Sequence, residues 1–177
     1  MDNTIQINGI KRLLGIKFIE LGVAQIRAAS TLPVEPKSDN SLFLKAAEAL
    51  GVPLNATDIA YYYTSWDNWQ QIINLLNPIA QAFPWEAGKY DCNNRSALMT
   101  SLSSLLFEIN TCGTTNCEVY DAKTGAFKYG HYANMICDDQ GILYLWDVDQ
   151  GGMFQKVTGN DMIMGVNKYH FNGIRAY

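Results

Sequence analysis

The sequence predicts an α+β fold in which helices come first and an antiparallel sheet follows. Up to about residue 109, apolar residues recur at helical spacing, and loop-forming residues separate the segments. Further along, apolar and aromatic runs are interrupted by KTG, DDQG and DQGG, which are turn signals between strands. A chain of 177 residues corresponds to about one domain. We therefore expect a single domain, 1–177, with a helical N-terminal part over 1–80 and a core over 81–177.

The first expected helix covers residues 7–29, where apolar residues form two stripes at helical spacing. A helix that is apolar on two faces is either buried on both or docks on a partner, so docking or self-association through this helix is expected. Residues 30–41 contain two prolines and several Asx and Ser residues, which predict a loop. A short helix follows, with Ser41 as its cap and Gly51 just past its end.

A third helix is predicted to begin after Ser65 and to end at Pro78, because proline cannot continue a helix. Its apolar stripe is expected in the core: Trp69, Ile72, Ile73 and Leu76.

A fourth helix is predicted to begin at Cys92 and to reach about Ile109. The residues just before and after the cysteine are polar, and an apolar pattern follows them. The side chains expected to point inward are Leu98, Leu102, Leu105, Leu106 and Ile109.

The second half of the chain contains strand patterns. HYANMIC and ILYLWDVD, joined by DDQG, predict an antiparallel hairpin, and YHFNGIRAY predicts a further strand.

Composition narrows the classes of partner. The net charge is −4, and the 13 lysines and arginines are not clustered, which argues against nucleic-acid binding. The pI near 5.1 argues against a basic membrane-binding surface. The N-terminal residues lack the pattern of a secretory signal, and no run of 18 apolar residues occurs to span a membrane. We expect a soluble protein, cytoplasmic or associated with a virion.

The four cysteines are at positions 92, 112, 117 and 137. They form no C-x-x-C pair, and the chain has only two histidines, so a structural zinc site is not expected. Cys112, Cys117 and Cys137 are expected to be small buried residues. A Cys112–Cys117 disulfide is the alternative for an oxidising compartment.

Cys92 differs from the other cysteines because it lies where a helix begins. Unpaired N–H groups at a helix N-terminus favour the thiolate, and they also stabilise an oxyanion formed on an attacked carbonyl. His131 opens a predicted strand and supplies a base. The residue that orients the imidazole is Asp147 or Asp149, which alternate onto one side of the neighbouring strand.

The segments YDCNNRSALMTSL, GHYANMI and ILYLWDVDQGG together resemble the transglutaminase-like and papain-like Cys–His–Asp superfamily, and more narrowly its small bacterial and phage members. The resemblance covers residues 85–152. It implies a papain- or transglutaminase-like core, with Cys92 as nucleophile, His131 as general base and acid, and Asp147 as the orienting group. Asn134 also fits the pattern of these proteins, and Trp85 is placed to line the site.

One position departs from this family. Papain-type enzymes place a glutamine shortly before the cysteine to complete the oxyanion hole, whereas Glu86 occupies that region here and Gln81 lies further back.

Two functions remain open at this point. The first is a hydrolase or transferase with a cysteine nucleophile that needs no cofactor and acts on an amide or peptide bond of a peptide or protein substrate. Peptidase, thiol protease, amidase and transglutaminase activities all fit, and cell-wall peptides are the substrate that the resemblance suggests. The alternative is a non-catalytic structural or binding component of a phage or bacterial assembly that retains the fold.

Overall fold

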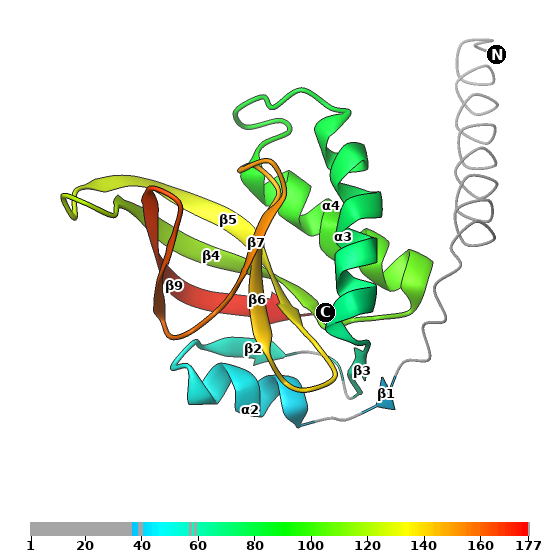
Figure 1. Cartoon of the computed structure of the whole chain (residues 1–177). Coiled ribbons are helices and arrows are strands. Elements are labelled where there is room, and N and C mark those ends of the chain that lie inside the picture. Colours follow the sequence, from blue (N-terminus) through cyan, green and yellow to red (C-terminus); the bar gives the residue numbers. More distant parts are fainter. Residues whose placement is uncertain (1–36, 39–40, 57, 59, 177) are drawn as a thin grey trace, which may run out of the picture. The chain divides into compact units, whose positions relative to one another are not determined.

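The computed structural model describes residues 37–38, 41–56, 58 and 60–176. These residues belong to a compact unit that spans Val34–Tyr177. Along the chain the elements are β1 (Lys37–Ser38), α2 (Leu42–Ala49), β2 (Leu54–Ala56), β3 (Tyr62–Tyr63), α3 (Trp66–Gln81), α4 (Cys92–Phe107), β4 (Cys112–Asp121), β5 (Phe127–Cys137), β6 (Leu143–Asp147), β7 (Met153–Lys156), β8 (Asp161–Met164) and β9 (Asn167–Ala176). Figure 1 shows this arrangement.

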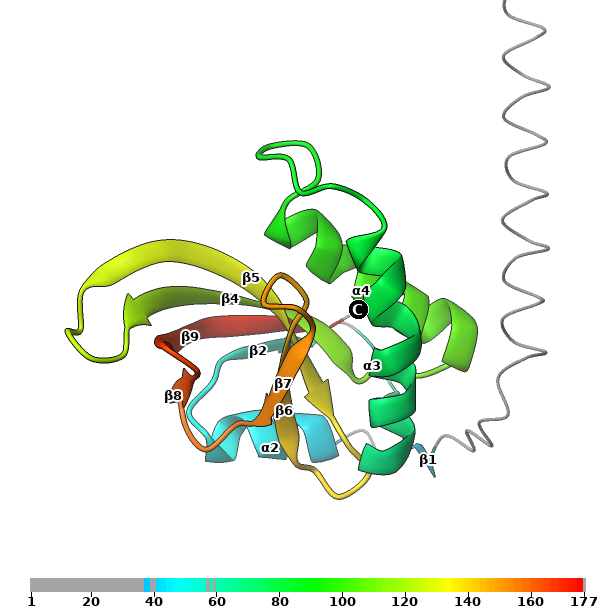
Figure 2. The same ribbon diagram turned by 45° about the horizontal axis from the view of Figure 1, so that its top comes forward.

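A seven-stranded sheet forms the centre of this unit. Its strand order is β2-β9-β4-β5-β6-β7, and β8 pairs with β9 beside this row. Every neighbouring pair is antiparallel except β2 and β9, which run parallel, with Leu54 opposite Ile174. A separate two-stranded sheet joins β1 to β3. Figure 2 shows β2, β9, β4 and β5 side by side.

The expected fold, N-terminal helices followed by an antiparallel sheet with a papain- or transglutaminase-like core, is wrong. β2 comes from the part of the chain expected to be helical, and its parallel pairing with β9 makes the sheet mixed. Among the described residues, more belong to strands than to helices. β2 has only three residues, which is too few for side-chain alternation to reveal a strand in the sequence.

The hairpin and the last strand confirm the strand predictions. β5 and β6 pair antiparallel, with Met135 opposite Leu145, and β9 occupies the C-terminal strand segment. Cys112 and Cys117 are buried free thiols, as is Cys137. Cys112 and Cys117 lie five positions apart on β4, so their side chains point to opposite faces and cannot form the alternative disulfide.

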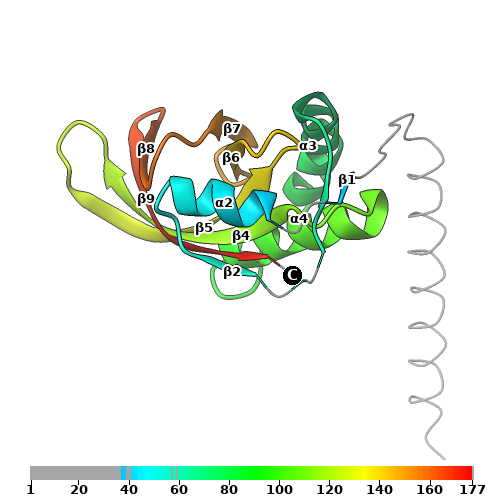
Figure 3. The same ribbon diagram turned by 90° about the horizontal axis from the view of Figure 1, so that it is seen from below.

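α2 confirms its predicted boundaries. Ser41 occupies the N-cap position, and Gly51, just past the end, has a φ of 69°, a conformation that favours glycine. Phe43 and Ala47 point into the hydrophobic core formed with the sheet. Figure 3 shows α2 lying against the curved sheet.

α3 begins where the sequence predicts. The side chain of Ser65 accepts a hydrogen bond from the Asn68 N–H at 3.3 Å. The predicted apolar stripe is buried in full: Trp69, Ile72, Ile73 and Leu76. The predicted end is wrong, because the helix continues past Pro78 to Gln81. Pro78 lies in the last turn, where its missing N–H removes one bond only, and the Ala82 N–H still bonds to the Pro78 carbonyl at 3.0 Å.

α4 begins at Cys92, as predicted, with Asp91 at the N-cap position. Its predicted inward face is largely wrong. Leu106 is buried in the helix, and Ile109 is buried just beyond its end. Leu98 and Leu102 are only half-buried, and Leu105 is exposed.

Polar side chains take the place of these leucines between α4 and the sheet. The Ser96 hydroxyl donates to the Ala133 carbonyl at 2.7 Å. Asn134 Nδ2 donates to the Ser96 carbonyl at 2.9 Å and to Thr100 Oγ1 at 3.1 Å. A buried polar group is tolerated when it is hydrogen-bonded, so α4 packs on β5 through a polar face. Asn134 therefore fixes the helix to the strand.

Two expectations depend on helices: docking or self-association through residues 7–29, and the lack of a membrane span. The helix predicted over 7–29, with its docking or self-association role, lies outside the described residues. Among the helices within the described ranges, none has the length and apolar character needed to cross a membrane.

Candidate active site

The pairing of β5 with β6 brings His131 and Asp147 together. Asn134 lies opposite Trp146, so the same register places Asp147 across from Ala133. His131 is two positions from Ala133 and therefore points to the same face of the sheet. His131 Nε2 lies 2.9 Å from Asp147 Oδ2. The two side chains are 5% and 0% exposed, so this pair is removed from solvent.

Asp147 is held by several further donors. Its Oδ2 accepts a hydrogen bond from the Tyr169 hydroxyl at 2.9 Å. Its Oδ1 accepts from the backbone N–H groups of Asp149 and Gln150 at 3.1 and 3.2 Å. These contacts fix the carboxylate, which in turn fixes the imidazole. The aspartate that orients His131 is thus Asp147, a choice that the sequence left open.

Cys92 is the first residue of α4, and its sulfur reaches the same place. Its Sγ, a ring nitrogen of His131 and a carboxylate oxygen of Asp149 all lie within 4.8 Å of one another. Because Nε2 of His131 is bonded to Asp147, Nδ1 is the nitrogen that remains for Cys92. All three residues chosen from the sequence, Cys92, His131 and Asp147, are therefore in one cluster.

The electrostatics of the cluster favour a protonated imidazole. Burial lowers the pKa of His131, but hydrogen bonds to Asp147 and Cys92 and the charges of both outweigh it and raise the pKa to about 10. His131 therefore carries a proton on each ring nitrogen at neutral pH. Burial, followed by the charge of Asp147, raises the pKa of Tyr169, so its hydroxyl stays a donor.

Asp149 forms an ion pair with an arginine that the sequence did not single out. Arg95 Nη1 lies 2.7 Å from Asp149 Oδ1, and Nη2 donates to the Phe83 carbonyl at 2.8 Å. The guanidinium carbon lies 5.3 Å from the centre of the Tyr90 ring. Arg95 thus joins α4, the loop before it and the turn after β6. Its position among the polar residues after Cys92 gave no signal of this pairing.

α3 positions the turn that follows β6. Gln81 Nε2 donates to the Val148 carbonyl at 2.6 Å, and Trp146 Nε1 donates to Asn77 Oδ1 at 2.8 Å. Gly152 lies so close to Asn77 that a Cβ at position 152 would be 2.0 Å from the side-chain nitrogen of Asn77. Together these contacts hold the chain between Asp147 and Gly152 against the helix.

A cavity of about 390 Å³ opens onto the cluster. Its lining residues are Trp85, Cys92, Tyr129, Gly130, His131, Asp149 and Gln150. Trp85 is 55% exposed, so it forms a wall of the cavity and is not a core residue. Glu86, which lies in the region where papain-type enzymes have a glutamine, is exposed and paired with Lys89.

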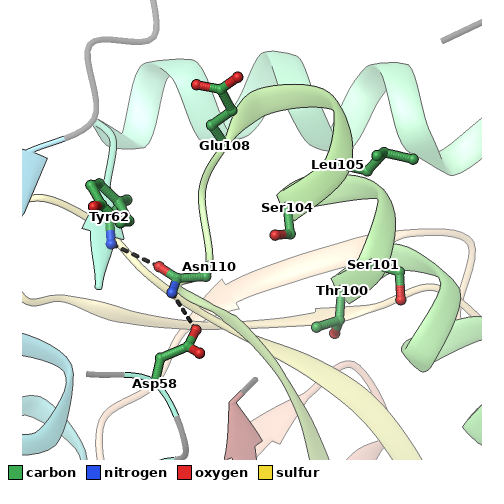
Figure 4. A pocket seen from close by; sticks show the side chains of 8 residues that line it. All are labelled: Asp58, Tyr62, Thr100, Ser101, Ser104, Leu105, Glu108 and Asn110. Carbon is green, nitrogen blue, oxygen red and sulfur yellow. Dashed lines mark hydrogen bonds between the residues drawn. The ribbon is translucent and has the colours of Figure 1, made fainter. Parts of the chain in front are cut away.

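A larger cavity of about 720 Å³ lies near the other end of α4 and is drawn in Figure 4. Because a helix rises about 1.5 Å per residue, its lining residue Ser104 is roughly 18 Å along the helix from Cys92. The Tyr62 N–H donates to Asn110 Oδ1 at 2.7 Å, and Asn110 Nδ2 donates to Asp58. The described residues that line it include no cysteine or histidine, so it offers neither a thiol nor an imidazole.

The second histidine and the tyrosine cluster Tyr61–Tyr63 lie away from Cys92 and His131. His170 is 40% exposed, and its Nδ1 lies 3.0 Å from Asp161 Oδ1. Tyr61 and Tyr63 are buried in the core, whereas Tyr62 is 41% exposed. Within the described residues, three side chains that could serve as metal ligands lie close together: Cys92, His131 and Asp149.

Comparison with known proteins assigns no family. No protein-family model matches the sequence, and no curated protein matches it. Among solved structures, the chain is similar to a PSL1a–E64 complex, with 16% identity and a TM-score of 0.44. It is also similar to the Polyporus squamosus lectin bound to a human-type influenza-binding epitope, with 14% identity and a TM-score of 0.45. Each alignment covers 67% of this chain and 45% of the other, so the chain spans less than half the length of those structures.

Proposed function

We propose that the protein is an acyl-transfer enzyme with a cysteine nucleophile that acts on an amide or peptide bond. The observation that carries the proposal is the connected set Cys92–His131–Asp147, in which a buried carboxylate holds an imidazole beside a partly exposed thiol. This is the arrangement that nucleophilic catalysis by a thiolate requires: a nucleophile, a base within reach and a group that orients the base.

The proposed first half-reaction forms a thioester. The Cys92 thiolate attacks the carbonyl carbon of the substrate, and the electron pair of the C=O bond moves to oxygen. The first N–H groups of α4 have no partner within the helix and donate to this oxyanion. His131 then gives its Nδ1 proton to the leaving amine as the C–N bond breaks, which leaves a neutral imidazole and an acyl group on sulfur.

In the second half-reaction, water or an amine attacks the thioester carbonyl while His131 removes a proton from it. The thiolate leaves, and the imidazolium that His131 has become is stabilised by Asp147. Water gives hydrolysis, as in a peptidase or amidase, and an amine gives transfer, as in a transglutaminase. Peptides are the substrate class we propose, with cell-wall peptides as the first to test.

The test is labelling with iodoacetamide at mildly acidic pH, located by peptide mass spectrometry. We expect Cys92 to be the labelled position, Cys92→Ala to abolish labelling, and Cys112→Ala, at a buried thiol, to leave it unchanged. Equal labelling of the wild type and Cys92→Ala would remove the basis for a catalytic thiol. The non-catalytic component of a phage or bacterial assembly would then be the better reading.

A further inference from the structure

We propose that Cys92, His131 and Asp149 bind a zinc ion, and that the bound ion reversibly blocks the Cys92 sulfur. The metal site is independent of the acyl-transfer reaction, whereas the blocking of the nucleophile rests on the proposed function. Structural zinc was not expected from the sequence, because the cysteines are dispersed and form no C-x-x-C pair. Folding has nevertheless brought a sulfur, a nitrogen and an oxygen donor from three separate segments into one place.

The chemistry of the donors selects the metal. Thiolate, imidazole and carboxylate are the three side-chain groups that zinc uses, and three protein ligands with one open position are typical of zinc sites that stay accessible. The donor atoms lie within 4.8 Å of one another. A tetrahedral zinc ion needs its ligands roughly 3.3–3.8 Å apart. Cys92 and Asp149 both line the cavity, and metal binding requires rotations of these two side chains that bring the donors closer together.

The contacts behind the donors are those that a metal site needs. A metal-bound histidine generally donates its other ring N–H to a carboxylate, and His131 donates to Asp147 in this way. Asp149 is oriented by Arg95 through Oδ1, and a carboxylate has a second oxygen with which to bind a metal. The cavity of about 390 Å³ gives access from solvent.

Binding requires the exchange of a proton for the metal. The zinc ion takes the position of the proton between Cys92 and His131 Nδ1, and this proton leaves to solvent. No oxidation or reduction occurs. Because the sulfur then shares its electron pair with the metal, it can neither attack a carbonyl nor be alkylated.

Cobalt(II) titration of the metal-free full-length chain tests the site without reference to activity. We expect one equivalent of Co²⁺ to produce a thiolate-to-cobalt absorption band, and Zn²⁺ to displace it. Cys92→Ser should remove the band, and Asp149→Asn should weaken Zn²⁺ binding at least tenfold. His170→Gln, in the histidine–aspartate pair that lacks a cysteine, is the matched control and should bind Zn²⁺ like the wild type. Circular dichroism checks that each variant is folded.

The absence of a cobalt band in the wild type would overturn the proposal. So would a Zn²⁺ affinity that is the same in Cys92→Ser, Asp149→Asn and wild type, since binding would then occur elsewhere. One equivalent of Zn²⁺ should also suppress iodoacetamide labelling of Cys92, and a chelator should restore it. A cobalt band without labelling of the metal-free chain would contradict the acyl-transfer function alone. Labelling without a band would contradict the metal site alone.

Discussion

The sheet carries two histidine–aspartate pairs that look alike in distance and differ in their surroundings. His131 lies 2.9 Å from Asp147, and His170 lies 3.0 Å from Asp161. The first pair is 5% and 0% exposed, whereas the second is 40% and 51% exposed. The first also has Cys92 on its far side, and the second has Lys168, which is 3.5 Å from Asp161.

Two hydrogen bonds of similar length therefore join one strongly coupled pair and one weakly coupled pair. Around His131, the buried partners raise the pKa to about 10. At the surface, the main effect is the hydrogen bond from His170, which lowers the pKa of Asp161. Water and salt screen the exposed pair, so its two partners are weakly coupled. Four predictions test this difference.

The largest expected effect is on the reactivity of Cys92. We expect His131→Gln to slow iodoacetamide alkylation of Cys92 by about 10²-fold or more, the usual contribution of a positioned acid–base group. His170→Gln should change the rate by less than about twofold. Stopped-flow or quenched-flow labelling in the presence of a chelator measures both rates. Similar losses in the two variants would mean that the pairs are equivalent and that our comparison is wrong.

The second prediction concerns the free energy of unfolding. Asp147→Asn should lower it by about 3 kcal/mol, because His131 loses a fully buried charged partner. Asp161→Asn should lower it by less than about 1 kcal/mol, since that pair is exposed. Urea denaturation followed by tryptophan fluorescence gives both values. A loss below about 1 kcal/mol for Asp147→Asn would show that its charge is not needed to hold the imidazole.

The third prediction concerns pH. The pKa of His131 rises from an unfolded value of about 6.5 to about 10, so the folded chain binds this proton more tightly. Its stabilising contribution is therefore complete below about pH 6.5 and is lost as the pH rises through about 10, with a slope of at most about 1.4 kcal/mol per pH unit. The difference in unfolding free energy between wild type and His131→Gln should shrink between about pH 7 and about pH 9. Both proteins contain the same buried thiols, so the contribution of thiol titration cancels in this difference. A difference that stays constant with pH would contradict the prediction.

The smallest effect on stability is expected from loss of the Tyr169 hydroxyl, which donates to Asp147. Tyr169→Phe removes the 2.9 Å hydrogen bond to Asp147 and should cost about 1.5 kcal/mol of stability. Tyr120→Phe removes a hydroxyl bonded to Glu118 and should cost clearly less, because that contact is only partly buried. Urea denaturation distinguishes the two, and equal losses would mean that burial does not strengthen the Asp147 contact.

The sequence could predict features that depend on neighbouring residues. Ser65 and Asp91 occupy the N-cap positions of α3 and α4, and a capping residue followed by a helical pattern is a local signal. The β5–β6 hairpin follows from alternation on either side of a turn. These elements are sufficient to place a thiol at a helix start and an imidazole on a strand, which is why two of the site residues could be chosen.

Features that depend on distant residues could not be predicted. β2 is defined by its pairing with β9 from the other end of the chain, and this pairing overturned the expected fold. The buried face of α4 includes hydroxyl groups that bond to β5, whereas hydropathy alone places leucines there. Asp147 and Asp149 are equivalent by alternation. The approach of Arg95 to Asp149 and of His131 to Asp147 distinguishes them.

The most direct test of the central claim is the mass of the chain during reaction with a p-nitrophenyl ester of a short acyl group. We predict a transient adduct of one acyl group on Cys92, formed in a burst of p-nitrophenol and released as the thioester is hydrolysed. His131→Gln should form it far more slowly, and His170→Gln should behave like the wild type. The absence of an adduct on Cys92, or equal rates in wild type and His131→Gln, would contradict the claim that these residues form a catalytic site.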